Sequence, residues 1–241
     1  MRIVVMNCNT DARMTETIGA GARAAARPGT EILALRPNWG PESVEGWYES
    51  FISAAAVLDR LHTIDVPFDA LVMAGFGEHG REGARELLDV PVIDITEAAA
   101  HVASLLGHRY GVVTTLRRAV GQIEDSLRTA GLLQRCALVT ATDLGVLELE
   151  KDPEATAQAF LAAAREAISA GAEVLCLGCA GMTGLQERIT AELGVPIVDG
   201  VAAAVKLAEG LVDLGFKTSK VGSYAAPLPK DRPGWPVSTT R

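Results

Sequence analysis

The sequence predicts an α/β fold of two similar lobes, and three observations support this prediction. Short apolar runs alternate along the chain with segments of helical periodicity. The runs are apolar throughout, as expected for strands of a parallel sheet that helices cover on both faces. The words VPVID at 90–94 and VPIVD at 195–199 indicate an internal repeat. We therefore predict two pseudo-symmetric, doubly wound parallel four-stranded lobes with the active site in the cleft between them.

Eight apolar runs are predicted to be strands, four in each lobe. In chain order they are 2–6, 31–35, 69–74, 91–95, 110–115, 136–141, 173–178 and 196–199. Segments rich in Ala, Leu, Glu and Arg separate most of them, as at 154–171 and 200–215, and are predicted to be helices. Gly171 and Gly194 are predicted to end helices, because glycine readily adopts the left-handed conformation found there.

The repeat also predicts how the chain divides between the lobes. We assign residues 1–105 and 206–241 to the first lobe, the latter as a C-terminal helix and tail, and residues 106–205 to the second. The tail from Tyr224 onward is rich in proline and is predicted to be irregular. A chain of 241 residues is long enough to give both lobes a hydrophobic core.

Bulk properties and missing motifs exclude several classes of function. The formal net charge of −8 argues against a nucleic acid or an anionic membrane as partner. No apolar run is long enough for a membrane span, and the N-terminus lacks a signal-peptide pattern. Four cysteines in this length do not indicate a disulfide scaffold, so we expect a cytoplasmic location; the Ala-rich helices permit a homo-oligomer. Walker, dinucleotide-binding, zincin and serine-hydrolase motifs are absent, and no metal site is expected.

The two halves differ at one strand end. Counting back from Pro91 reaches Gly75 after 16 residues, and counting back from Pro196 reaches Cys179 after 17. With one inserted residue in the second half, Gly75 and Cys179 are equivalent. Without it, Ala74 would be the equivalent of Cys179, so the register is open by one residue.

Cys179 is the strongest catalytic candidate. It follows an apolar strand, stands between Gly178 and Gly181, and precedes a helix predicted to begin near Thr183. A thiol at a helix N-terminus has a lowered pKa and can act as a base or nucleophile. A small buried hydrophobic residue is an equally open interpretation. Cys176, earlier in the same strand, is predicted to belong to the core.

Polar residues follow the first strand of each lobe, at the strand ends where open α/β sheets bind ligands. Cys8 lies between Asn7 and Asn9 after the first strand, and Thr114 and Thr115 end the corresponding strand of the second lobe. These side chains can donate hydrogen bonds to a ligand or cap the helix that follows. Both interpretations stay open at the level of sequence.

Two further features concern the rim of the cleft. His79 lies in the loop after the third strand and could act as a base, because imidazole titrates near neutral pH. A solvated loop histidine is the favoured alternative. The segment 40–50, with Glu45, Trp47 and Tyr48, is predicted to be a long loop of the kind that closes over a cleft.

Six short motifs occur together over most of the chain. They are N-x-N-T at 7–10, V-E-G-x-Y at 44–48, F-G-x-x-G at 76–80, V-T-T-L at 113–116, L-G-C-A-G-M at 177–182 and T-S-K-x-x-S-Y at 218–224. In this combination the sequence resembles the hydantoin racemases of the Asp/Glu racemase superfamily, from about residue 2 to residue 230. The resemblance implies two pseudo-symmetric α/β lobes, a small-molecule substrate bound between them, and no cofactor.

The resemblance also implies a mechanism. In the family that this chain resembles, two cysteines on opposite faces of a carbon acid remove and return the proton α to a carbonyl. Cys179 matches the second of these cysteines, Gly75 replaces the first, and Cys8 stands where the family has a proline. We therefore expect Cys8 to supply the first-lobe thiol, because the first and third strands of such a sheet are neighbours. His79 is the less favoured substitute.

The implied function is that of a cofactor-independent racemase or epimerase, an isomerase acting on a hydantoin-like or amino-acid-derived substrate. The expected substrate-binding residues are Asn7, Asn9, Tyr48, Gly75, Phe76, Thr114, Thr115, Gly178, Ala180 and Gly181. One alternative is a one-cysteine lyase similar to the arylmalonate decarboxylases, in which loss of CO2 itself generates the enolate. The other is a homologue that binds a ligand without catalysis.

Overall fold

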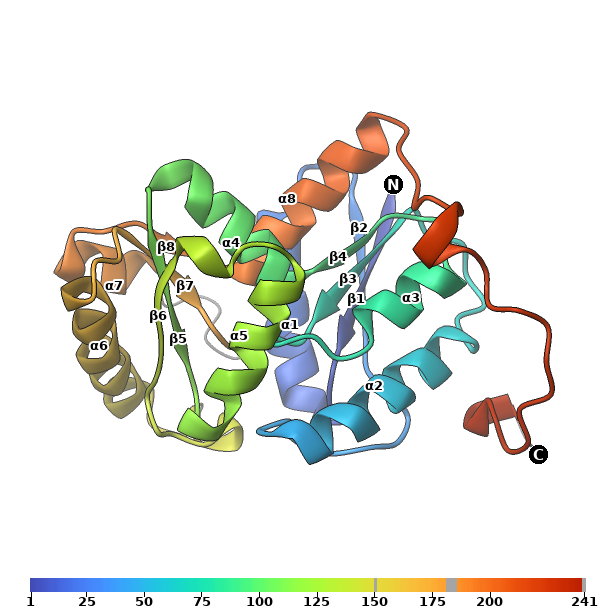
Figure 1. The fold of residues 1–241 in the computed structure, drawn as a ribbon, viewed down its shortest axis with the longest axis horizontal. Helices are drawn as coiled ribbons and strands as arrows, with labels where there is room; N and C mark the ends of the chain where they lie inside the picture. The colour runs from blue at the N-terminus through green and yellow to red at the C-terminus, as the bar shows by residue number, and fades with distance from the viewer. Residues whose placement is uncertain (150, 181–185, 240–241) are drawn as a thin grey trace.

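Two four-stranded parallel sheets form the centres of two lobes in the computed structural model, which describes residues 1–149, 151–180 and 186–239 (Figure 1). The first sheet has the order β2-β1-β3-β4 and the second the order β6-β5-β7-β8. All pairings between these strands are parallel. The predicted fold class is confirmed, and so is the neighbourhood of the first and third strands.

The strands lie within one or two residues of the predicted apolar runs. They are β1 (Arg2–Asn7), β2 (Glu31–Leu35), β3 (Ala70–Ala74), β4 (Val92–Asp94), β5 (Tyr110–Thr114), β6 (Cys136–Ala141), β7 (Val174–Leu177) and β8 (Ile197–Val198). The central strands β1, β3, β5 and β7 are almost wholly buried, because helices cover both faces of each sheet.

Eight α-helices surround the two sheets in the described residues. They are α1 (Ala12–Ala25), α2 (Trp47–Leu61), α3 (Arg81–Leu87), α4 (Ile95–Leu106), α5 (Val120–Thr129), α6 (Pro153–Ser169), α7 (Gln186–Leu193) and α8 (Gly200–Asp213). Gly171 and Gly194 follow α6 and α7 with φ values of 99° and 70°, as predicted for helix ends. Within the described residues, none of the helices is both long and apolar enough to cross a membrane.

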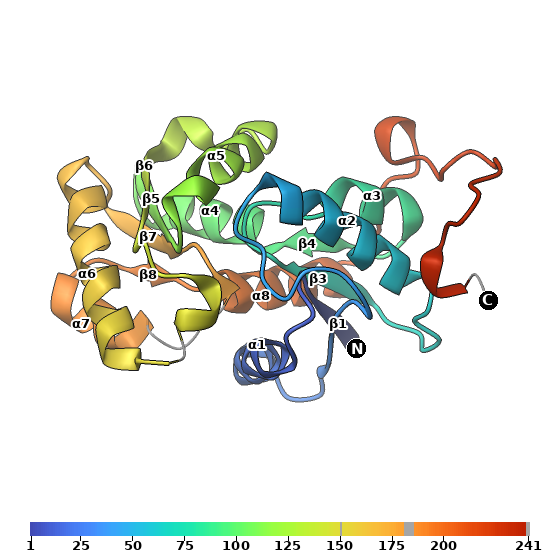
Figure 2. The same ribbon diagram turned by 90° about the horizontal axis from the view of Figure 1, so that it is seen from below.

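The hydrophobic core connects the lobes. Helices α2 and α3 cover one face of the first sheet and α1 the other, as Figure 2 shows. Helices α6 and α7 cover the outer face of the second sheet. The largest cluster of buried apolar side chains includes residues of α1, α4, α5, α8 and both sheets. Helix α4 contacts β7 as well as α8, so it lies between the lobes. The proposed domain boundary after residue 205 falls inside α8, which packs on α1, α4 and β3.

The repeated aspartates have a structural explanation. Asp94 ends β4, and its Oδ1 accepts hydrogen bonds from the first-turn N–H groups of Thr96 and Glu97 in α4. Asp199 follows β8 and caps α8 in the same way. Each aspartate satisfies helix N–H groups that have no partner within the helix. The repeat therefore places a strand-to-helix transition at the same point of each lobe.

Two predictions about the surface segments need comment. The segment 40–50 was predicted to be a loop throughout, but α2 begins at Trp47. An apolar and polar pattern of helical spacing, with Ser50, Ser53 and Val57 buried, overrides the turn residues that precede it. The tail is mostly irregular as predicted, with short 3-10 turns at Gly222–Tyr224 and Val237–Thr239.

Candidate functional site

Strand register resolves which residues of the two lobes correspond. The Leu71 N–H donates to the carbonyl oxygen of Pro91 at 2.9 Å, and the Leu175 N–H donates to that of Pro196 at 3.0 Å. Leu71 and Leu175 are therefore equivalent, and four residues later so are Gly75 and Cys179. The one-residue ambiguity in the sequence alignment is thereby removed, because hydrogen-bond pairing in a ladder fixes the register that residue counting left open.

A second equivalence follows from the central strand pairs. Leu71 lies opposite Val4, and Leu175 lies opposite Gly111. Four residues beyond these partners stand Cys8 in the first lobe and Thr115 in the second. The first lobe thus has a thiol after β1 and glycine after β3, whereas the second has threonine after β5 and cysteine after β7.

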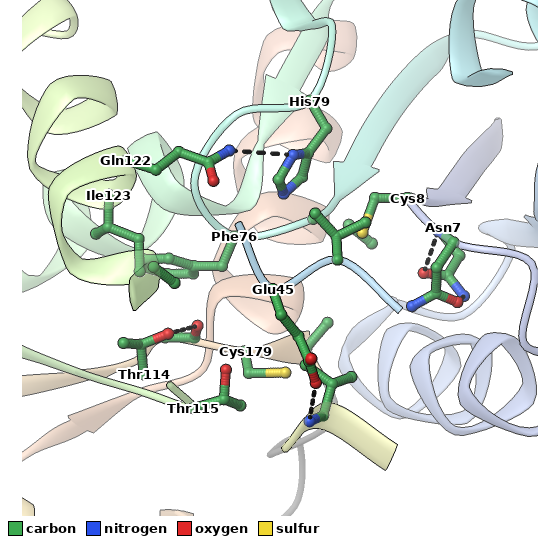
Figure 3. Close-up of a pocket in the computed structure, with 18 of the residues that line it drawn as sticks. Asn7, Cys8, Glu45, Phe76, His79, Thr114, Thr115, Gln122, Ile123 and Cys179 are labelled. Carbon is green, nitrogen blue, oxygen red and sulfur yellow. Dashed lines mark hydrogen bonds between the residues drawn. The ribbon is translucent and has the colours of Figure 1, made fainter. Parts of the chain in front are cut away.

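The carboxyl ends of β1, β3, β5 and β7 border a cleft between the lobes (Figure 3). Among the described residues, its lining comprises Asn7, Cys8, Asn9, Met14, Val44, Glu45, Ala74, Gly75, Phe76, His79, Thr114, Thr115, Ala119, Gln122, Ile123, Val146, Gly178, Cys179 and Ala180. The fold therefore brings together nearly all of the predicted site residues. Gly181 and the helix start predicted near Thr183 lie outside the described residues.

Cys8 fills the space beside Gly75. Asn7 pairs with Ala74 across β1 and β3, so the next residue of each strand is also adjacent. A Cβ atom on Gly75 would lie 2.6 Å from Cβ of Cys8 and 2.9 Å from its sulfur, and closer still to Cδ2 of His79. Real Cβ atoms do not approach other atoms so closely. A side chain at position 75 is thus incompatible with the present positions of Cys8 and His79.

The environment of Cys8 keeps its proton on the sulfur. Burial raises the pKa of the Cys8 thiol to about 12, and the nearby charges of Cys179 and Asp94 act in the same direction. The Cys8 side chain is therefore a thiol, not a thiolate, at neutral pH. Ser53 Oγ donates a hydrogen bond to the Cys8 carbonyl oxygen, which ties this loop to α2.

Cys179 is held by the close approach of β5 and β7. The Gly178 N–H donates to the carbonyl oxygen of Val113 at 2.8 Å, and Thr114 Oγ1 donates to the carbonyl oxygen of Gly178 at 3.1 Å. A Cβ atom on Gly178 would lie 2.7 Å from the Val113 oxygen, so only glycine permits this approach. Thr114 and Gly178 therefore position the backbone from which half-buried Cys179 lines the cleft.

His79 is buried, which corrects the favoured prediction of a solvated loop histidine. Only 5% of its surface is exposed, and its Nδ1 lies 3.0 Å from Ser50 Oγ. Burial lowers the pKa of His79 to about 4, so the imidazole is neutral at neutral pH. The left-handed Gly77 (φ 114°) and Gly80 (φ 101°) turn the loop inward, and this turn could not be read from residue spacing.

The amides of Asn7 and Asn9 line the cleft but also build the loop that carries Cys8. Asn7 Nδ2 donates to Asn9 Oδ1 and to Thr15 Oγ1, both at 2.9 Å. Asn9 Oδ1 in turn accepts from the Asp11 N–H at 3.0 Å. These bonds fix the turn between β1 and α1 and use most of the polar capacity of the two amides.

Tyr48 is the predicted site residue that the structure places away from the cleft. It lies in the first turn of α2 with 74% of its surface exposed, and it is not part of the lining. Helical geometry explains this position, because the buried face of α2 contains Ser50, Ser53 and Val57, and residue 48 points the opposite way.

Sequence reasoning gave no individual site role to three polar residues, of which Glu45 and Gln122 line the cleft. Glu45 Oε1 accepts a hydrogen bond of 2.8 Å from the Val146 N–H of the other lobe. Gln122 Nε2 donates to Ser50 Oγ at 2.6 Å, again between the lobes. Glu78, in the loop after β3, has a φ of 71°, which is unusual for a residue other than glycine and often marks a functional loop. Lobe-to-lobe contacts leave no local sequence signal, although Glu45 lies in a segment predicted to cover the cleft.

A buried cluster of charged side chains lies where the loop after β3 joins α3. Arg81 is only 1% exposed, and its guanidinium lies 3.8 Å from Asp94 and 3.3 Å from Glu97. Burial raises the pKa of Asp94 to about 7 although Arg81 opposes this rise. Across residues 1–149, 151–180 and 186–239, no group of three His, Cys, Asp or Glu side chains is placed to hold a metal ion.

Comparisons with known proteins agree with this architecture. The family described as Asp/Glu/Hydantoin racemase matches residues 3–208. A crystal structure named allantoin racemase from Pseudomonas fluorescens is 59% identical, with a TM-score of 0.95, and the match covers 96% of this chain and 99% of that one. A protein named hydantoin racemase from Pseudomonas sp. (strain NS671) is 40% identical, over 97% of this chain and 95% of its own length. A structure of arylmalonate decarboxylase, at 18% identity and a TM-score of 0.56, shares the fold alone.

Proposed function

The chain belongs to the Asp/Glu/hydantoin racemase family, and on this premise we propose that it racemises a 5-substituted hydantoin by moving the proton on ring carbon C5. The protein is then an isomerase acting on a small molecule. The observation that carries the proposal is the pair of thiols, Cys8 and Cys179, which reach one cleft from different lobes. Two groups on opposite faces of a carbon acid can invert its centre, whereas one group can only exchange its proton.

The proposed cycle assigns one proton to the pair of thiols. Cys179 removes the C5 proton from one face, and Cys8 returns a proton to the other face of the enolate. The raised pKa of Cys8, about 12, suits the acid role in this direction. In the reverse direction the pair starts with the proton on Cys179. The charge of Cys179 raises the pKa of Cys8, so two thiolates at once are disfavoured.

Thr115 is the proposed donor to the developing enolate oxygen. Thr114, its neighbour, already donates its hydroxyl to the Gly178 carbonyl oxygen, so it acts as a positioning residue. Thr115 directly follows β5 and, like Cys179, lines the cleft. A hydroxyl held in place before the reaction stabilises charge at low reorganisation cost.

The charge of the lining favours a neutral ring over a free amino acid. Among the described lining residues there is no lysine or arginine to neutralise an α-carboxylate. A hydantoin ring presents N–H donors and carbonyl acceptors without a full charge. This pattern suits the threonine hydroxyls and the backbone groups at the strand ends.

The assignment of Cys8 departs from the family pattern. On this proposal Gly75 stands at the position of the family's first cysteine, and Cys8 on the neighbouring strand takes over its space. His79 is a weaker substitute, because its imidazole is neutral, buried and bonded to Ser50. A decarboxylase with one cysteine is less well supported, since the relatives of high identity are named racemases.

The test follows the C5 proton by NMR in D2O, together with optical rotation, on enantiopure 5-substituted hydantoins. We expect wild type to exchange and to racemise. Cys8→Ser should lose racemisation by about 10²- to 10⁴-fold while Cys179 still exchanges the proton on its own face. Cys136→Ser, at a thiol outside the cleft lining, is the matched control and should behave as wild type.

The same measurement identifies a different second group. If Cys8→Ser racemises like wild type, Cys8 is not the acid. His79→Gln is then the informative variant, because His79 is the less favoured substitute and also lines the cleft. Release of CO2 from an arylmalonate, without exchange on any hydantoin, would support the lyase instead.

A further inference from the structure

The outward face of α2 is apolar along the whole helix. Trp47, Phe51, Ala55, Leu58 and His62 follow one another at intervals of three or four residues, so they share one face, which we call the α2 stripe. It lies largely opposite the buried face, and none of its members is Asp, Glu, Lys or Arg. An ordinary surface helix has polar residues outward, whereas a helix that is apolar all round is buried. The stripe therefore has the composition of a covered surface.

The stripe begins at a groove between α2 and α5. Trp47 and Phe51 line this groove, with 45% and 68% of their surfaces exposed and their rings stacked at 6.0 Å. Gln122 lines both the groove and the cleft, so the groove lies behind the wall of the cleft. The described lining also includes three acidic residues, Glu78, Glu82 and Asp125.

The stripe ends at a hollow beneath the C-terminal tail. Leu58 and His62 line the hollow together with Leu87 of α3 and Trp235 of the tail. The rings of His62 and Trp235 meet edge to face at 6.5 Å. Residues 225–234 of the tail are almost all exposed, and Figure 1 shows them as an arm that stands away from the body.

The two ends of the stripe are complementary to each other. Exposed aromatic rings stand at one end and a partly apolar hollow lies at the other, about 22 Å away at 1.5 Å per residue. The arm carries Lys230 and Arg232 on either side of Asp231, and the guanidinium of Arg232 bonds to backbone oxygens of the arm itself. The arm is therefore basic, whereas the groove at the other end is acidic.

We infer that the α2 stripe is the interface between two copies of this chain, packed antiparallel about a two-fold axis that passes near Ala55. The aromatic rings of each copy then enter the hollow of the other, and each arm reaches the acidic groove of the other. A two-fold interface requires a surface that is complementary to itself in this way. The inference does not rest on the proposed function, because the stripe lies outside the described cleft lining.

The first experiment measures the assembly state by gel filtration with light scattering over a range of concentrations. Wild type should be a dimer, or a larger assembly that contains this dimer. Phe51→Glu should raise the dissociation constant of this contact by about 100-fold or more, because it buries a carboxylate without a partner. Leu105→Glu on α4, at a leucine that is 86% exposed, is the matched control and should assemble as wild type. Circular dichroism checks that both variants fold.

Cysteine cross-linking tests the antiparallel arrangement. Ala55→Cys faces its own counterpart across the two-fold axis and should form a covalent dimer when copper-phenanthroline and O2 oxidise the two thiols. Trp47→Cys alone should not, because its two copies lie at opposite ends of the interface. Trp47→Cys mixed with His62→Cys should cross-link. Wild type, with four native cysteines, measures the background.

Three results would overturn the inference. They are a monomeric wild type at all concentrations, an unchanged assembly in folded Phe51→Glu, and cross-linking of Trp47→Cys to itself in place of Ala55→Cys. A monomer would leave the stripe to a partner of another kind. Racemisation by such a monomer would contradict this inference and leave the proposed function intact, so the two proposals fail in distinguishable ways.

Discussion

The two lobes present the same strand ends to one cleft but carry different side chains there. Gly75 in the first lobe corresponds to Cys179 in the second, and Cys8 corresponds to Thr115. The backbones of the two lobes are pseudo-symmetric, but the side chains at their strand ends are not. Because β1 and β3 are neighbours, a group at the end of either strand reaches the same space. On the proposed function, the duplicated scaffold would keep one reactive group per lobe without keeping it at the equivalent residue.

The second lobe provides the largest expected effect. Cys179→Ser replaces the thiol by a hydroxyl that is a far weaker acid, and we expect kcat/KM for racemisation to fall by about 10²- to 10⁴-fold. Cys179→Ser should also lose C5 proton exchange on the face of the substrate that Cys179 serves. This is the face on which Cys8→Ser still exchanges the proton. The two variants would then be complementary. Equal residual exchange in both would contradict the division of the two faces between the lobes.

In the first lobe, His79 should make the free energy of unfolding fall as the pH is lowered. The folded protein lowers the pKa of His79 from 6.5 to about 4, so between these values the unfolded chain binds more protons. Stability from this group is complete above pH 6.5 and is lost as the pH falls toward 4, by about 3 kcal/mol. Urea unfolding of wild type and His79→Gln at several pH values measures this slope. A slope that persists in His79→Gln would assign it to other groups.

Position 75 tests the packing difference between the lobes. Gly75→Ala places a methyl group against Cys8 and His79, and we expect the free energy of unfolding to fall by about 1–3 kcal/mol. Adding Cys8→Gly should restore part of this loss, because one of the two contacts is removed. Cys179→Ala, at the equivalent position, should cost less than Gly75→Ala. Additive effects of Gly75→Ala and Cys8→Gly would show that the two positions do not compete for space.

The smallest effect is expected at Tyr48. Its exposed position on α2 predicts that Tyr48→Ala changes kcat/KM by less than about twofold, since surface substitutions of this kind have small effects. Steady-state kinetics on a 5-substituted hydantoin measures this. A loss of tenfold or more would mean that the first turn of α2 rearranges when substrate binds.

Much of this protein could be read from its sequence. The eight strands, the two lobes and the repeat follow from apolar runs and helix-period segments, because burial imposes a local pattern on each element. Cys179 and Cys8 were identifiable as strand-end residues for the same reason. Even the capping role of Asp94 and Asp199 leaves a local signal in the repeated VPxxD words.

Tertiary structure alone decided which of these residues meet. The bond between Glu45 and Val146 joins residues 101 apart in the chain, and no local pattern specifies such a pair. His79 is buried by left-handed turns at Gly77 and Gly80, and Tyr48 points outward because α2 starts one residue earlier. The competition between Cys8 and position 75 for one space likewise depends on strands that pair across 67 residues of chain. Sequence determined the elements, because each is stabilised by its own pattern of burial; the site depends on distances between elements, which only packing sets.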